Sequence, residues 1–275
     1  MIKLLNAGFT RLRKNRAFWL FLIFSIFMSL FMIYTQYKDM KEYGEVIQVE
    51  QIILNYSTII GIVIAIFVSL FLGVEYSDGA IRNKITIGHS RIQIYLSNLI
   101  IVSIASVFCY IVFSFISACV GTPLFGWVKV EGINFTTLFI DILFLIMAFS
   151  AIDTFIAMAC SNKTYTAIGT IIVAFLMMMI ALTCFNLLCS SPIIQTVTIN
   201  ESGEMITKEE PNPRYPTEKE MKIYQTIVDF LPAGQAFQIA GRNNTNFNIL
   251  PVYSLVNVII FTGAGLIIFN KKELK

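Results

Sequence analysis

Six long stretches almost without charged residues constrain this chain more than any other feature. They cover Ala17–Tyr34, Ile52–Gly73, Ile94–Gly121, Phe135–Ala159, Tyr165–Cys189 and Ile249–Phe269. Each is close to or above the length of about 20 apolar residues that a helix needs to cross about 30 Å of hydrocarbon. We therefore expect an all-α integral membrane protein with six transmembrane helices.

The charged residues gather between these stretches, and their sign indicates the orientation. Only 13% of the residues are charged, against about 25% in a soluble domain. Segments 1–16, 75–93, 160–164 and 270–275 together hold twelve Lys and Arg residues and three acids, whereas the segments on the other side hold eight and twelve. Cytoplasmic loops carry the excess of Lys and Arg. We expect a multi-pass plasma membrane protein with both termini in the cytoplasm.

The first 16 residues form an amphipathic pattern. On a helix, Ile2, Leu5, Phe9 and Leu12 share one face, and Lys3, Arg11 and Lys14 lie opposite. Such a helix lies along a membrane surface with its cations at anionic headgroups. We expect an interfacial helix over 1–16, followed by five spans within 17–189.

The longest inner loop, 75–93, predicts a short helix at about Gly79–Ile87. Asp78 is placed to cap its start and Gly88 to end it. Ile81 and Ile85 lie one turn apart, and Arg82 and Lys84 are expected to be exposed. After this helix, Ser90-Arg-Ile-Gln93 matches the capping-box pattern that opens the third span.

The outer segment 190–248 is far longer than a plain connector. Alternation over Ile193–Ile206 predicts a hairpin with its turn near Asn200–Gly203, and a polar, proline-rich stretch follows over Glu209–Pro216. A helix is expected from Thr217, and Phe230–Ile239 returns to the membrane surface. We expect this segment to form a compact cap over the spans, before the sixth span and basic tail in 249–275.

The sequence predicts no catalytic or metal site. It contains neither a G-x-x-x-x-G-K-[ST] loop nor a glycine-rich dinucleotide turn, and its one histidine, His89, has no ligands at metal-binding spacing. Glu209-Glu-Pro-Asn-Pro-Arg214 resembles an intramembrane protease signature, but Pro211 and Pro213 forbid the helix that this chemistry needs. The five cysteines are interpreted as packing residues. We expect no enzyme activity and no cofactor bound by this chain.

Asp141 and Asp153 are the acids inside the fourth span. An intramembrane acid is costly and is a functional candidate for that reason. Both lie about six residues from an end of the span, where water or headgroups can reach, or where a neighbouring span can pair with them. The favoured interpretation is a solvated or paired acid, and the alternative is a proton or ion relay.

Several motifs resemble those of the membrane subunits of ABC-2-type exporters. They are Glu75-Tyr-Ser-Asp-Gly-Ala-Ile-Arg-Asn-Lys84, Ser90-Arg-x-x-Ile-Tyr-Leu-Ser97, Ser161-Asn-Lys163, Phe230-Leu-Pro-Ala-Gly-Gln235 and Phe269-Asn-Lys-Lys-Glu-Leu-Lys275. The resemblance covers the whole chain, and the first motif is the most specific part.

This resemblance implies a permease that pairs with a second permease copy or paralogue and with two copies of a separate ATPase, which bind ATP and Mg²⁺. It implies an elbow role for the N-terminal helix and a coupling role for the inner-loop helix, through Glu75, Asp78, Ile81, Arg82, Lys84 and Ile85. Glu75 would hold a basic group from the partner or from the N-terminal helix. The chain's size resembles that of bacterial exporters for antimicrobial peptides, bacteriocin self-protection or related amphiphiles.

Two other classes of function stay open at this point. A secondary transporter or channel would use Asp141 and Asp153. A membrane immunity protein would bind a peptide at the outer segment without moving it. Neither class, nor the exporter, implies a nucleic-acid partner.

Overall fold

The computed structural model confirms the six spans. It describes residues 1–44, 48–126, 134–160, 162–199, 205–242 and 247–272. Helices long and apolar enough to cross a membrane are α2 (Arg16–Tyr43), α4 (Ser57–Ser77), α6 (Arg91–Phe125), α7 (Phe135–Ala159), α8 (Lys163–Leu188) and α11 (Leu250–Lys271). The first span extends beyond its predicted end at Tyr34 because the helix continues until Gly44, whose φ of 70° ends it in the left-handed conformation.

Shorter elements surround the spans. Described helices outside the spans are α1 (Ile2–Lys14), α3 (Val49–Asn55), α5 (Ala80–Thr86), α9 (Glu218–Phe230), α10 (Pro232–Gly241) and the 3₁₀ turn η1 (Phe247–Ile249). Strands β1 (Ile193–Ile199) and β2 (Met205–Pro211) form an antiparallel hairpin. The predicted second span is therefore two helices, with Tyr56 between α3 and α4.

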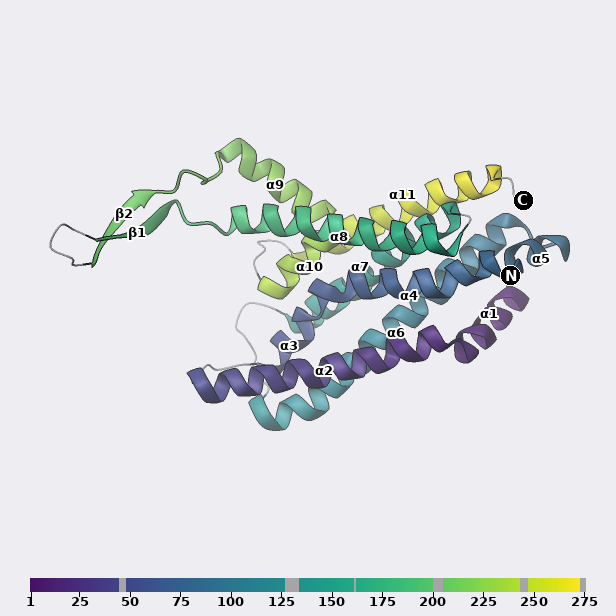
Figure 1. Cartoon of the computed structure of the whole chain (residues 1–275), viewed down its shortest axis with the longest axis horizontal. Helices are drawn as coiled ribbons and strands as arrows, with labels where there is room; N and C mark the ends of the chain where they lie inside the picture. The colour runs from purple at the N-terminus through teal and green to yellow at the C-terminus, as the bar shows by residue number, and fades with distance from the viewer. Residues whose placement is uncertain (45–47, 127–133, 161, 200–204, 243–246, 273–275) are drawn as a thin grey trace.

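Figure 1 shows the spans running side by side, with both chain termini, α1 and α5 at one end of the bundle. We call this the terminal end. Helix α7 is central, since it contacts α4, α6, α8 and α11. The outer sides of α2, α8 and α11 are largely exposed, as expected of helices that face lipid.

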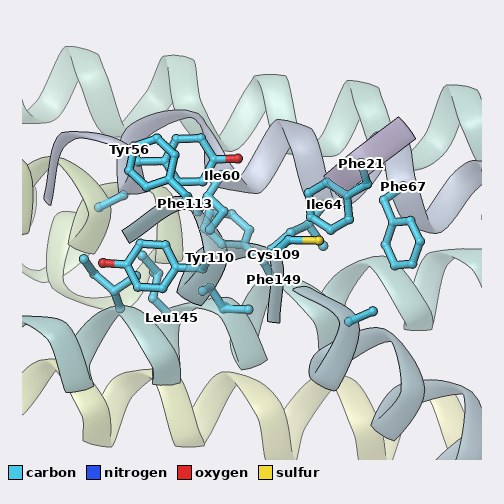
Figure 2. Packing of buried hydrophobic residues seen from close by; sticks show 14 of the residues in the cluster. Phe21, Tyr56, Ile60, Ile64, Phe67, Cys109, Tyr110, Phe113, Leu145 and Phe149 are labelled. Carbon is cyan, nitrogen blue, oxygen red and sulfur yellow. The ribbon is translucent and has the colours of Figure 1, made fainter. Parts of the chain in front are cut away.

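The core lies between the central spans and consists of aromatic and aliphatic side chains (Figure 2). The rings of Tyr56 and Phe113 stack with centroids 3.9 Å apart. Some polar side chains within this core pair with each other, because hydrocarbon offers them no water. Ser25 Oγ lies 3.2 Å from the Tyr56 hydroxyl, and Ser29 Oγ lies 2.9 Å from Ser117 Oγ.

The predicted hairpin is present, but it does not cap the spans. It pairs Ile193 with Pro211 and Ile199 with Met205, so β2 includes Glu209–Pro211 from the polar, proline-rich stretch. The predicted turn at 200–203 lies outside the described residues. Figure 1 shows the hairpin projecting away from the bundle, which corrects the expectation of a compact cap over all of 190–248.

The rest of the outer segment packs on the spans. The helix expected from Thr217 is present as α9, and Thr217 caps it in a capping box with Glu220. Helix α10 contacts α4, α7, α8 and α9, and Ser57 Oγ donates to the Ala236 carbonyl at 3.0 Å. Residues Phe230–Ile239 therefore cover the ends of the spans that lie opposite the terminal end.

Candidate functional site

Four polar side chains from four helices meet at the terminal end of the bundle. Glu75, in the last turns of α4, is only 2% exposed. Its Oε1 forms ion pairs with Arg11 of α1 and Lys84 of α5, and its Oε2 accepts a hydrogen bond of 2.7 Å from Asn98 Nδ2 of α6. We call Arg11, Glu75, Lys84 and Asn98 the Glu75 cluster. Of the two partners predicted for Glu75, the structure shows the N-terminal helix.

The Glu75 cluster contains two cations for one carboxylate. Burial lowers the pKa of Arg11 to about 10, so its guanidinium stays charged at neutral pH. It lies 4.0 Å from the centroid of the Phe71 ring, which attracts the cation through its quadrupole. Burial, and secondly the charge of Arg11, lower the pKa of Lys84 to about 7. Lys84 is thus a group of this cluster that titrates near neutral pH.

The inner-loop helix is present as α5, but Asp78 does not cap it. The N-cap is Gly79, with φ of 66° and no capping side chain, and Asp78 is exposed. Helix α4 ends at Ser77 and α5 begins at Ala80. The chain changes direction between them at Gly79, which has the left-handed conformation. Gly88, with φ of 98°, follows the end of α5 as the sequence predicted.

The apolar side of α5 packs onto its own chain. Ile81 is 2% exposed and belongs to a cluster with Leu4 and Phe269, and the half-buried Ile85 packs against the same cluster. Ile81 therefore offers no surface to a partner, which corrects the expected apolar contact there. The exposed residues of α5 and its C-terminus include Arg82 and Ile87, and Ile87 is 76% exposed. Sequence reasoning overlooked Ile87, although a large apolar residue next to the terminating glycine was a visible signal.

Helix α1 also turns a different face inward than the sequence predicted. Leu4, Gly8 and Leu12 are buried, Ile2 is 76% exposed, and Arg11 points inward to Glu75. A Cβ at Gly8 would collide with Ile101 of α6, so this helix packs closely on the protein. The sequence predicted Arg11 on the polar face of α1, directed away from the protein. This prediction is wrong because Arg11 forms an ion pair with the buried carboxylate of Glu75.

Two basic residues outside the predicted site tie helix ends together at the same end of the bundle. Arg91 Nη1 donates to the carbonyls of Phe269 at 2.9 Å and Asn270 at 3.0 Å. Lys272 Nζ donates to three carbonyls at the C-terminus of α7, those of Met158, Ala159 and Cys160, at 2.7–3.0 Å. Both contacts place a cation at the negative end of a helix dipole. Burial lowers the pKa of Lys272 to about 8.

Asp141 and Asp153 are buried, and the described residues provide no partner for them, which differs from the favoured expectation of a solvated or paired acid. They are 2% and 1% exposed. No hydrogen-bond partner for any of their four carboxyl oxygens occurs in the described part of the chain. Helix α7 is central to the bundle, so neighbouring helices cover these side chains although they lie near its ends. Within the same described residues, no group of three His, Cys, Asp or Glu could hold a metal ion.

Comparison with known proteins agrees with this architecture. A family described as ABC-2 family transporter protein matches residues 4–181. This match runs from α1 through most of α8, includes the whole Glu75 cluster, and ends before the hairpin. No curated protein matches the chain. Because the family match covers more than half of the 275 residues, the chain belongs to the ABC-2 family of membrane transporter proteins.

Proposed function

We propose that this chain is the permease subunit of an ATP-driven exporter for an amphiphilic substrate, such as a peptide or a lipid-like compound. In this proposal the terminal end faces the cytoplasm of the cell. The observation that supports it is the Glu75 cluster, which joins α1, α4, α5 and α6. A second permease copy or paralogue and two copies of a separate ATPase complete the transporter, and the ATPase binds ATP and Mg²⁺.

The Glu75 cluster is suited to transmitting movement into the spans. Helix α5 has seven residues, and it is held at Lys84 by the ion pair and at Ile81 by burial. A displacement of α5 therefore moves α4 directly through Glu75 and moves α6 through Asn98. A flexible loop of the same length would absorb such a displacement.

The exposed residues Arg82 and Ile87 are the proposed contact with the ATPase. Arg82 presents a planar guanidinium to acidic groups of the partner, and Ile87 presents an apolar side chain. Asp78, exposed at the turn before α5, lies on the same loop. Lys84 and Glu75 act behind this surface, as positioning residues for α5.

The test is co-purification with the partner ATPase, for which the adjacent reading frames are searched first. Arg82→Glu and Ile87→Asp are expected to weaken ATPase association at least tenfold, and Arg82→Lys is expected to have a smaller effect. Lys222→Glu, a charge reversal at an exposed position of α9, is the matched control. Wild-type association of both Arg82→Glu and Ile87→Asp would overturn the assignment of this surface.

A second candidate function is supported by the buried acids of α7. Carboxyl groups without partners inside a membrane occur in proton and ion pathways, so a secondary transporter would use Asp141 and Asp153. The two functions differ in their energy source. Transport in vesicles that requires ATP and persists without an ion gradient supports the exporter, and gradient-driven transport without ATP supports the second candidate.

A further inference from the structure

An apolar groove lies on the outside of the bundle between α2 and α4, and none of its lining residues belongs to the Glu75 cluster. Its volume is about 490 Å³, and its lining residues are all apolar. Its floor is formed by Phe21 and Phe67, which are 5% and 2% exposed and whose rings stack with centroids 4.9 Å apart. Figure 2 shows these two rings next to each other. Leu20, Ile23 and Phe27 form the rim on the α2 side and are largely exposed.

The length of the groove corresponds to one leaflet of a bilayer. On α2 it extends from Ala17 to Phe27, which is about 15 Å along the axis of an α-helix. The hydrocarbon core of a bilayer is about 30 Å thick. Since α2 begins at Arg16, the groove starts at the headgroup level of the terminal end and ends near the middle of the membrane.

Basic side chains lie at the headgroup end of the groove. Arg16 has helical spacing to Leu20, Ile23 and Phe27, so it continues the same face of α2 that forms the rim. It is exposed, and among the described residues no ion pair is found for it. Arg13 and Lys14, at the end of α1, are also exposed.

We propose that the groove binds one anionic phospholipid of the cytoplasmic leaflet, with an acyl chain over Phe21 and Phe67 and the phosphate at Arg16. The leaflet rests on the orientation given under the proposed function, whereas the pairing of groove and cation does not. The apolar lining selects an acyl chain, and the cations select a negative headgroup.

Charge also argues against a second copy of this chain as the occupant. Two copies with the same orientation in one membrane are related by an axis along the membrane normal. If they docked through this groove, the cations of both copies would lie at the same depth, where like charges repel. An anionic lipid neutralises these cations instead.

The test is native mass spectrometry of the purified full chain with dioleoyl phosphatidylglycerol or dioleoyl phosphatidylcholine, which differ in headgroup charge but not in acyl chains. We expect the wild type to retain phosphatidylglycerol preferentially. Arg16→Gln should weaken its retention about fivefold, and Arg16→Lys should restore most of it. Lys3→Gln, at an exposed position of α1, should retain the lipid as the wild type does.

A second variant tests the groove itself. Ile66 lines the groove and is 43% exposed, so Ile66→Trp fills it from the lipid side without disturbing the core. We expect at least a tenfold loss of phosphatidylglycerol retention. Ile259→Trp, at a 70% exposed position of α11, is the matched control and should retain the lipid.

Three outcomes would overturn the proposal. They are equal retention of the two lipids by the wild type, unchanged retention in Ile66→Trp, or conversion of a dimer into a monomer by Ile66→Trp. The last outcome would show that a second copy occupies the groove. Lipid retention in detergent requires neither ATP nor the ATPase, so its result is independent of the exporter assignment.

Discussion

Buried carboxylates at the terminal end and inside α7 have opposite surroundings. Glu75 has two cations and one amide as partners, whereas Asp141 and Asp153 have no hydrogen-bond partner among the described residues. The partners of Glu75 include Arg11 and Lys84, which come from short helices outside the spans. The spans themselves contain no Lys or Arg in their apolar interiors. Basic residues are therefore available for ion pairs at the ends of the bundle but not in the apolar interiors of the spans.

This contrast predicts where the fold depends on charge. At the terminal end, three helices are held to α4 through one carboxylate, so removing it leaves buried cations unpaired. Inside α7, the described residues give Asp141 and Asp153 no ion pair that a substitution could break. The following predictions test this difference, beginning with the largest expected effect.

Glu75→Gln should give the largest loss of stability. The change leaves Arg11 and Lys84 at a buried site without a countercharge, and breaking such a pair costs about 3–5 kcal/mol. Thermal unfolding of the purified protein can be followed with a thiol-reactive dye, because Cys109 and Cys184 are buried and react when the protein opens. We expect a clearly lower apparent Tm.

The control for this change is Glu42→Gln. Glu42 forms an exposed ion pair with Lys38 at 3.9 Å on α2, and exposed pairs of this kind contribute less than about 1 kcal/mol. If Glu75→Gln and Glu42→Gln have the same small effect, the Glu75 cluster does not hold the terminal end together.

Lys272→Met should have an intermediate effect. The ammonium group of Lys272 donates to three carbonyls at the end of α7, and Met keeps most of the apolar stem. Loss of these charge-assisted hydrogen bonds should cost about 1–3 kcal/mol, seen as a lower apparent Tm in the same assay. Lys271→Met changes an exposed neighbour and should change Tm little. Equal effects of the two variants would contradict the capping role of Lys272.

Lys84 gives a pH test of the same end of the bundle. Its pKa is lowered from 10.5 to about 7, so between these values the unfolded chain binds more protons and stability from this group rises with pH. Competitive acetylation, read by mass spectrometry, should show Lys84 becoming reactive near pH 7. Arg11→Met removes a repelling charge, so the midpoint should move to higher pH. An unchanged midpoint would show that Arg11 does not act on Lys84.

The spans could be predicted from sequence because hydrocarbon imposes a long uncharged run on each of them. The end of the first span was missed because α2 continues past Tyr34 until Gly44 ends it. The predicted second span is two helices, α3 and α4. The position of α5 was predicted at about Gly79–Ile87, and Gly88 follows its end as predicted, although its N-cap is Gly79 and not Asp78. Local pattern and local geometry agree at Gly88.

The contacts of the site could not be predicted, because they join residues far apart in the chain. Periodicity placed Arg11 on the polar face of α1. No residue near Arg11 in the sequence indicates that it pairs with Glu75. Burial of Ile81 against Leu4 and Phe269 depends on how three separate helices pack. Lys272 donates to backbone carbonyls. Every residue has such a carbonyl, so no side chain in the sequence indicates which carbonyls accept these hydrogen bonds.

Asp153→Asn should have the smallest effect, and it tests the other side of the comparison. Asp153 is fully inside the bundle and has no described partner, so the fold loses no ion pair when the carboxyl becomes an amide. Asn has the same shape and cannot ionise, which avoids the cost of a buried charge. We expect an apparent Tm equal to or slightly above that of the wild type. ATP-dependent transport should continue, since the ATPase supplies the driving force. A loss of transport with normal Tm and normal ATPase association would instead assign Asp153 to the transport pathway, and the unpartnered acids of α7 would then be the working part of the protein.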